Sequence, residues 1–452
     1  MSSSSRVAQP PLMWCLVLAL GVTQPAVKPG WLSVARAIHA TKMKPDHVLD
    51  AMPSIAASFE VSGGGVTPLL ADCTGSQFSL SWQTKSYFKD DPEAERIRVK
   101  KSNPVGGGWS YEHMRDDTRR TPLYYAAIRK RLAEADEPLT VLDLGTGALA
   151  LLALEAARAG AKKVYAIEHE PVSAKLARAA IAEAGFSGVI EVFEGYSTEV
   201  TLPEKVDVLI SEVVGSMASE EGLYATIADA HARHVKRPTE PSSWIPYRSQ
   251  TWGAPSSYAL HYGLGRPDYD WFGMPGPPRI AADDAALQVL ATPKLVEEID
   301  FTDPHLPVSG QFPITPEGGV SFTIDAERLD ANAAAYAEAC TAEWGDDDEA
   351  EEADEEEEAE EAASFAAGLS TSLSGFAFWP RLVLDPEASI VVECRGEQGE
   401  PKPSSWGVLL PLLSERPLAI AAGETLVLKL AVHLEEGLES PPRYVMEGEW
   451  RR

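Results

Sequence analysis

The sequence predicts a two-part protein: a parallel, doubly wound α/β domain, followed by a mainly antiparallel β barrel or sandwich. Strand-like and helix-like runs alternate over residues 111–245, and short β-type runs separated by Pro and Gly replace them over residues 246–452. Alternating strands and helices at this spacing form parallel sheets, whereas successive short strands joined by turns form antiparallel barrels or sandwiches. A length of 452 residues fits two or three domains.

The elements of the α/β part follow from hydrophobic periodicity and from breaks at glycine. Gly160 and Gly185 each follow an apolar helical run directly, and glycine commonly ends helices because it adopts the left-handed conformation. We expect helices over 111–133, from the turn after Gly147 to about Ala159, and over 172–184, and strands over 139–144, 163–168, 189–194 and 206–211.

The C-terminal part contains five β-type runs, at 320–324, 376–384, 390–394, 407–413 and 425–433. An acidic segment, residues 346–361, interrupts them with 13 acids and no base in 16 residues. Such a segment is typical of a solvated, disordered loop, and attraction of a cationic substrate is the alternative. Residues 46–110 include a possible strand at 78–82, but we assign this N-terminal extension no fold.

Residues 1–45 resemble a targeting segment. The apolar run 12–22 has 11 residues, whereas a membrane-spanning helix needs about 20, so no stable membrane span is expected. The run fits the apolar core of a signal peptide, and residues 23–44 are basic and acid-free, as in an organelle transit peptide. This predicts an organelle or the secretory route; a disordered extension on a cytoplasmic or nuclear protein is the alternative.

The composition excludes several function classes. The net charge of −29, from 39 Lys and Arg against 68 Asp and Glu, repels phosphates and therefore opposes direct nucleic-acid binding. It favours a cationic partner instead. Four cysteines without a CxxC pair predict neither a disulfide framework nor a cysteine zinc site, and no histidine spacing predicts a metal site.

A turn of Gly145, Thr146 and Gly147 between the strand 139–144 and the next helix predicts a nucleoside-type ligand, because glycines allow close approach and helix N-termini offer free N–H groups. Glu168, 25 residues after Asp143, is placed to accept both ribose hydroxyls. The turn also fits the dinucleotide fingerprint, so an NAD-type oxidoreductase stays open. Asp143 favours the ammonium group of an amino-acid-bearing nucleotide such as S-adenosylmethionine.

Two glutamates follow the strand 206–211, at Glu212 and, nine residues on, at Glu221. The carboxyl edge of such a sheet is where ligands bind. Two carboxylates placed there can grip a guanidinium through its rigid fork of donors. The alternative is a pair of surface acids in a very acidic chain.

Residues 111–452 resemble the protein arginine methyltransferases, a family of class I S-adenosylmethionine-dependent enzymes. The similar stretches are Met114–Tyr125, Val141–Gly147, Glu194–Thr198, Ser211–Glu221, Ile245–Arg248 and Ser404–Trp406, in the family's order. The resemblance implies a Rossmann-like domain with a C-terminal barrel. It implies catalytic roles for Glu212, Glu221, Met114 and Trp406, and cofactor-binding roles for Arg120, Asp143, Gly145, Thr146, Gly147, Glu168, Ser197 and Thr198.

The chain departs from the family pattern at three positions. Leu149 replaces a third glycine, and Ser405 replaces the histidine before Trp406. Thr198 replaces an acid of the stretch Glu194–Thr198, which resembles the family's adenine-side segment. The resemblance still implies S-adenosylmethionine as cofactor and a basic, arginine-rich protein as substrate. It also implies a homodimer formed through an arm at about 263–295. A methyltransferase with another acceptor and a non-catalytic scaffold for basic partners are the alternatives.

Overall fold

The computed structural model describes the following residues: 77–83, 114–259, 261, 277–282, 284, 286–344, 363–364, 366–395, 406–414, 417–435 and 442–451. Several predicted features lie outside these ranges: the predicted targeting segment 1–45, most of residues 46–110, the acidic segment 346–361 and much of the predicted arm 263–295. Ser404 and Ser405 lie outside them too. The predictions made for those segments therefore stay predictions.

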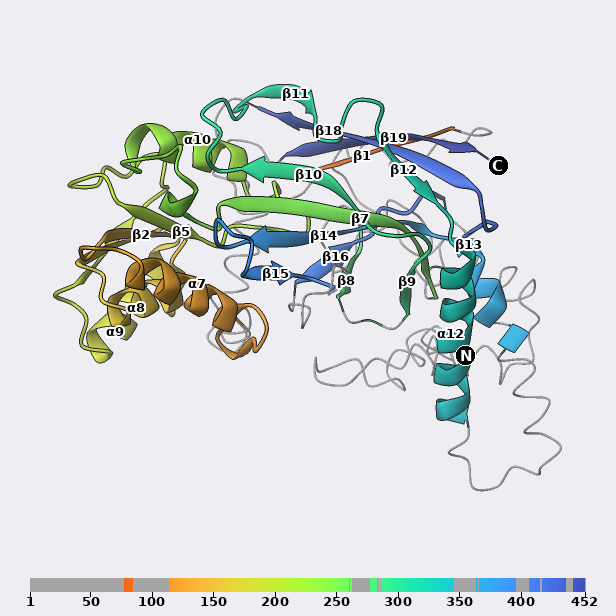
Figure 1. Cartoon of the computed structure of the whole chain (residues 1–452), viewed down its shortest axis with the longest axis horizontal. Helices are drawn as coiled ribbons and strands as arrows, with labels where there is room; N and C mark the ends of the chain where they lie inside the picture. The colour runs from red at the N-terminus through yellow and green to blue at the C-terminus, as the bar shows by residue number, and fades with distance from the viewer. Residues whose placement is uncertain are drawn as a thin grey trace, which may run out of the picture.

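A five-stranded parallel sheet forms the centre of the N-terminal domain, as predicted. Its strands lie in the order β4 (Ile190–Glu194), β3 (Lys163–Glu168), β2 (Thr140–Leu144), β5 (Val208–Ser211) and β6 (Trp244–Ile245). Figure 1 shows α7 (Thr121–Ala133), α8 (Leu151–Arg158) and α9 (Pro171–Glu183) gathered on one side of this sheet and α10 (Leu223–Arg233) on the other. Helices on both faces explain why every residue of β2 is buried.

The predicted helix over 111–133 is wrong at its N-terminal end. A single helical turn at 114–116 is followed by a break, and the regular helix α7 begins only at Thr121. The side chain of Asp117 accepts hydrogen bonds from the backbone N–H groups of Arg119 (2.7 Å) and Arg120 (2.8 Å). Because aspartate competes in this way with the helical ladder, the chain turns there and a new helix starts.

Two antiparallel sheets form the C-terminal domain, which confirms the predicted class. One has the order β1-β19-β18-β11, with β12 also paired to β18; the other has the order β10-β7-β14-β16-β8, with β15 and β9 added to β14 and β7. The bounds are β1 (Gln77–Gln83), β7 (Arg248–Tyr258), β8 (Arg279–Ala281), β9 (Leu287–Val289), β10 (Lys294–Asp300), β11 (Gly310–Pro313), β12 (Val320–Thr323), β14 (Gly375–Val383), β15 (Val391–Glu393), β16 (Gly407–Leu409), β18 (Thr425–Leu434) and β19 (Arg443–Arg451). A separate two-stranded sheet joins β13 (Ser372–Leu373) to β17 (Leu418–Ala419).

The strand β1 belongs to the C-terminal sheet although it precedes the α/β domain in the chain. It pairs antiparallel with β19 along its whole length, and its alternate residues Phe78, Leu80 and Trp82 are buried. The Trp82 ring stacks on Tyr444 with ring centroids 5.4 Å apart. A segment from the N-terminal extension therefore completes the core of the barrel.

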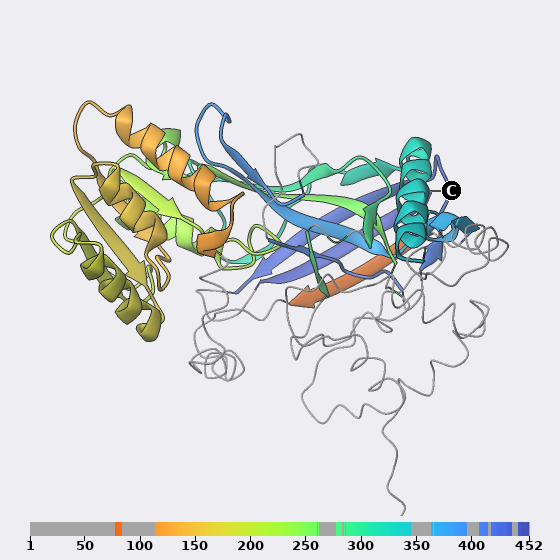
Figure 2. The same ribbon diagram turned by 90° about the horizontal axis from the view of Figure 1, so that it is seen from below.

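Helix α12 (Ala326–Trp344) has no counterpart among the predicted elements. Figure 2 shows it at the end of the barrel far from the α/β domain. Asn332 and Tyr336 attach it to the strand β9 region, because their side chains donate hydrogen bonds to the carbonyls of Val289 (2.9 Å) and Ala286 (2.8 Å). Within the described ranges, no helix combines the length and the apolar character needed to cross a bilayer.

Candidate active site

The register of three neighbouring strands brings the predicted site residues to one edge of the parallel sheet. Leu144, the last residue of β2, lies opposite Ile167 of β3 and Ser211 of β5. The residues that directly follow these positions are Gly145, Glu168 and Glu212. The glycine turn, the predicted ribose carboxylate and the first glutamate of the acidic pair therefore lie side by side.

The glycine turn packs closely against the loop that carries the glutamates. Gly145 has a φ of 77°, which L side chains rarely adopt, and its N–H donates to the carbonyl of Ile167. A Cβ atom at Gly145 would lie 3.0 Å from Cγ1 of Val213, one residue beyond Glu212. The glycine turn is therefore in contact with residues 212–221, the segment that contains both predicted glutamates and that we call the acceptor loop.

Asp143 has one carboxylate oxygen without a partner, although only 1% of the residue is exposed. Its Oδ2 accepts hydrogen bonds from Thr146 Oγ1 (2.6 Å) and from the N–H of Ala153 (2.9 Å), whereas its Oδ1 accepts none. Burial raises the pKa of Asp143 to about 6. A buried acceptor of this kind suits a cationic donor on a ligand, such as an ammonium group.

Glu168 is held ionised at the end of β3. Burial acts to raise its pKa, but hydrogen bonds outweigh it and leave the pKa below the ordinary value. The donors are the side chain of His169 and the N–H groups of Glu170 and Gly147, the last two each at 2.9 Å. An ionised carboxylate beside the glycine turn can accept the hydrogen bonds of two vicinal hydroxyls.

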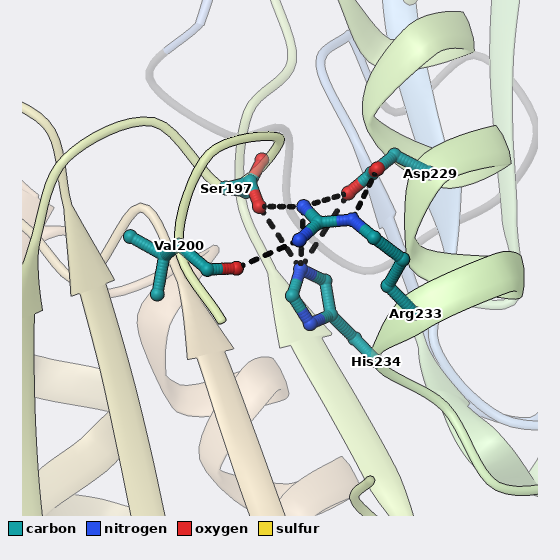
Figure 3. A network of polar contacts seen from close by, with 5 residues as sticks. All are labelled: Ser197, Val200, Asp229, Arg233 and His234. Atoms are coloured by element: carbon teal, nitrogen blue, oxygen red, sulfur yellow. Dashed lines mark hydrogen bonds and ion pairs between the residues drawn. The ribbon is translucent and has the colours of Figure 1, made fainter. Parts of the chain in front are cut away.

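The predicted adenine-side segment is anchored to helix α10 by a polar network, which Figure 3 shows. The guanidinium of Arg233 donates to the carbonyls of Ser197 and Val200, and the ring of His234 lies 3.0 Å from the same Ser197 carbonyl. Asp229 pairs with Arg233 through both carboxylate oxygens. The carbonyl of Ser197 is thus hydrogen-bonded to residues at the C-terminal end of α10. Thr198, the next residue, is half-buried.

Glu212 and Arg120 form a largely buried ion pair at the start of the acceptor loop. Arg120 Nη1 lies 2.6 Å from Glu212 Oε2, and the two side chains are 9% and 11% exposed. The Arg120 guanidinium also lies over the ring of Trp406, 5.6 Å from its centroid. Burial raises the pKa of Glu212, and Arg120 and a hydrogen bond from Trp406 partly oppose that increase. Three residues predicted from distant motifs therefore meet in one cluster.

Met114 lies next to this cluster along the chain. Its carbonyl accepts a hydrogen bond from Thr121 Oγ1 at 2.5 Å, which fixes the turn before α7 to the first residue of the helix. Tyr124, one turn into α7, donates from its hydroxyl to the carbonyl of Ser211 at 3.0 Å. Helix α7 therefore connects the turn that contains the half-buried Met114 to the end of β5.

The second half of the acceptor loop contains residues that were not predicted. Glu220 is only 1% exposed and binds the guanidinium of Arg279 with both carboxylate oxygens, at 2.9 and 3.0 Å. The predicted Glu221 is half-buried and close enough to Arg279 to raise the pKa of that guanidinium, to which Glu220 contributes most. In the sequence, the adjacent acids Glu220 and Glu221 could have indicated a role for Glu220. Its pairing with Arg279 of β8 could not be predicted from the sequence.

Comparison with known proteins extends this picture. Residues 121–227 match the model of the family described as ribosomal protein L11 methyltransferase (PrmA). The chain is 37% identical over 142 residues to protein arginine N-methyltransferase PRMT10 of Arabidopsis thaliana, covering 31% of this chain and 36% of that protein. It is 40% identical over 135 residues to arginine N(omega)-methyltransferase of Streptomyces achromogenes subsp. streptozoticus, covering 29% and 36%. The chain thus spans about a third of the length of these relatives.

Two solved structures resemble most of the chain. The crystal structure of Arabidopsis thaliana protein arginine methyltransferase 10 has a TM-score of 0.50 and 20% identity, covering 78% of this chain and 99% of that chain. The Trypanosoma brucei PRMT1 enzyme-prozyme heterotetrameric complex with AdoHcy has a TM-score of 0.50 and 17% identity, covering 76% and 98%. At these identities the likeness establishes the fold, an α/β domain joined to an antiparallel barrel.

Proposed function

We propose that this chain, which has the fold of the protein arginine methyltransferases and carries a methyltransferase domain, transfers methyl groups from S-adenosylmethionine to arginine side chains of proteins. The observation that carries the proposal is the contact between the glycine turn and the acceptor loop. Gly145 and Glu212 follow paired positions of β2 and β5, so a bound nucleoside and a bound guanidinium would be neighbours. Proximity of this kind supplies much of the rate in a group transfer.

The residues around the glycine turn fit the cofactor. The orphaned Oδ1 of Asp143 provides an acceptor for its ammonium group, and the ionised Glu168 provides one for its ribose hydroxyls. Arg120, which already binds a carboxylate at Glu212, would also bind the cofactor's carboxylate. When bound, S-adenosylmethionine supplies an electrophilic methyl group on its sulfonium.

The acceptor loop would hold and orient the arginine. Free arginine is protonated at neutral pH, so its guanidinium is attracted by Glu212 and Glu221 and can be aimed by charge-assisted hydrogen bonds. Burial raises the pKa of Glu212, which makes this carboxylate a better proton acceptor than an ordinary surface glutamate. Trp406, in contact with both Arg120 and Glu212, would exclude water from one side of the pocket.

The test is transfer of a labelled methyl group from S-adenosylmethionine to three acceptors. These are an arginine-glycine-rich peptide, the same peptide with lysine in place of arginine, and free arginine. We expect labelling of the first peptide only. The Glu212→Gln variant should lose at least 100-fold in kcat, because one oriented carboxylate is removed, and should still bind S-adenosylhomocysteine.

Glu155→Gln is the matched control for this variant. Glu155 is a buried glutamate of α8, an element separate from the acceptor loop, and it is paired with Arg129 at 2.5 Å. Its substitution should leave kcat within threefold of the unmodified enzyme. Full activity of Glu212→Gln would refute the assignment, and labelling of free arginine alone would move the proposal to a small-molecule acceptor. Binding of NAD instead of S-adenosylhomocysteine would favour an oxidoreductase.

The proposed substrate is a basic, arginine-rich protein. The chain's net charge of −29 attracts such partners, most strongly at low ionic strength where screening is weak, and repels nucleic acid. Self-association remains part of the proposal, because one structural neighbour is described as a heterotetrameric complex. We also propose that residues 1–45 act as a targeting segment.

A further inference from the structure

Arg279 connects the barrel to two points of the acceptor loop, residues 212–221. It lies at the start of β8, and its Nη1 donates to Ser216 Oγ at 2.9 Å and to Glu220 Oε2 at 3.0 Å. Its Nη2 donates to Glu220 Oε1 at 2.9 Å. The contact is bidentate and bridges both ends of the turn 216–220, so the guanidinium fixes the shape of the turn as well as its charge.

The loop is built around the carboxylate of Glu220. Glu220 Oε2 also lies 3.3 Å from the N–H of Met217, which donates to it. A Cβ atom at Gly215 would lie 2.2 Å from the same oxygen and 2.7 Å from Cβ of Glu220, so this position accepts only glycine. Burial of an unpartnered carboxylate is costly, and the guanidinium of Arg279 pairs with both oxygens of Glu220.

The two halves of the loop are supported by different domains. The α/β domain holds the first half, where Arg120 binds Glu212. The barrel holds the second half, because Thr251 of β7 accepts the N–H of Ala218 at 2.9 Å and Ser219 shares a hydrogen bond with Tyr444 of β19. Arg279 adds a cationic contact from the barrel to this second half.

Glu221 follows Glu220 directly, and helix α10 begins two residues later at Leu223. Gly222 between them has a φ of 76°, in the left-handed region, and is the residue at which α10 starts. A shift of Glu220 would therefore move the backbone of Glu221 as well. Glu221 also helps to raise the pKa of the Arg279 guanidinium, although less than Glu220 does.

We propose that Arg279 is a positioning residue for methyl transfer: by clamping Ser216 and Glu220 it sets the place of Glu221 against the acceptor guanidinium. The inference rests on the proposed function. It predicts that the barrel contributes to the rate of transfer without contacting the cofactor. It also predicts that the planar fork of arginine, and not the positive charge alone, is required at position 279.

The experiment measures kcat, peptide KM and S-adenosylhomocysteine binding for Arg279→Gln, Arg279→Lys and Arg248→Gln, with activity normalised to cofactor-binding sites. Arg248 is the matched control, since it is a barrel arginine 38% exposed against 39% for Arg279 and also pairs with acids, Glu298 and Asp300. We expect kcat to fall about 100-fold in Arg279→Gln and about tenfold in Arg279→Lys, because misplacement of a catalytic group by about 1 Å has effects of this size. Cofactor binding should stay within twofold, and Arg248→Gln should match the unmodified enzyme.

The double variant Arg279→Gln with Glu220→Gln covers the case in which the single variant does not fold. It removes the unpaired buried charge and should recover the folded fraction while kcat stays at least tenfold low. A normal kcat in the double variant, or in Arg279→Gln, would overturn the inference. An equal loss in Arg248→Gln, or a parallel loss of cofactor binding, would also overturn it, because either result indicates a general effect on folding. Absence of transfer in the unmodified enzyme would instead refute the proposed function.

Discussion

Asp143 gives the protein a pH-dependent instability that substitution by asparagine should remove. Its pKa of about 6 in the fold lies about 2 units above the ordinary 3.8. At 1.36 kcal/mol per unit, the difference amounts to about 3 kcal/mol. Because the folded protein holds this proton to higher pH than the unfolded chain, the contribution of Asp143 to the free energy of unfolding is fully present below pH 4 and is lost as the pH rises through 6.

The assay is urea unfolding of the unmodified protein and of Asp143→Asn at pH 5 and pH 8. Asparagine keeps an oxygen for the Thr146 and Ala153 donors and has no charge to desolvate. About half of the effect, roughly 1.5 kcal/mol, develops between these two pH values. Between pH 5 and pH 8, the free energy of unfolding of Asp143→Asn should therefore rise by about 1.5 kcal/mol relative to that of the unmodified protein.

Asp207→Asn serves as the control. Burial acts to raise the pKa of Asp207, but hydrogen bonds from Thr140 and Lys236 leave it lowered, so this carboxylate is ionised at both pH values. Its substitution should change stability equally at pH 5 and pH 8. The reasoning is refuted if Asp143→Asn shows the same constant difference. A second measurement is S-adenosylhomocysteine affinity, which should be about tenfold weaker at pH 5, where Asp143 is mostly protonated.

Two further predictions concern the cofactor side of the site. Arg233→Met should weaken S-adenosylhomocysteine binding about tenfold in calorimetry, because it releases the carbonyls of Ser197 and Val200, which anchor the adenine-side segment. The control is Arg178→Met, which removes a similar contact to the carbonyl of Val192 on the outside of the domain and should have little effect. Ala150→Gly should raise the free energy of unfolding by about 1 kcal/mol, because Ala150 has a φ of 47°; an unchanged or lower value would show that the left-handed conformation costs nothing there.

The sequence could predict that the candidate cofactor-binding residues gather at one edge of the sheet, because they follow strand ends. Asp143 and Glu168 lie at or next to a break between a buried strand and a helix, and parallel strands bring such breaks to one edge. The same logic located Glu212 after β5. These positions depend on local patterns and on one general rule of sheet topology, so no tertiary detail was needed.

The acceptor side was only partly predictable because it depends on contacts between domains. Arg279 is 59 residues from Glu220 in the chain and lies on a strand of three residues, too short to show a period. The break at Asp117 arises from a side chain competing with a helix that the apolar pattern alone favoured. Helix α12 has an alanine-rich sequence, and its burial is decided by packing against the β9 region.

The pairing of β1 with β19 has a consequence for how the chain is made. Gln83 and its register partner Arg443 are 360 positions apart. During synthesis the parallel sheet, complete at Ile245, can form long before β19 leaves the ribosome, whereas β1 must wait for it with Phe78, Leu80 and Trp82 uncovered. The barrel is therefore the slow, late-folding half of the molecule, and a nascent chain halted before residue 443 would need a chaperone to protect that apolar strand.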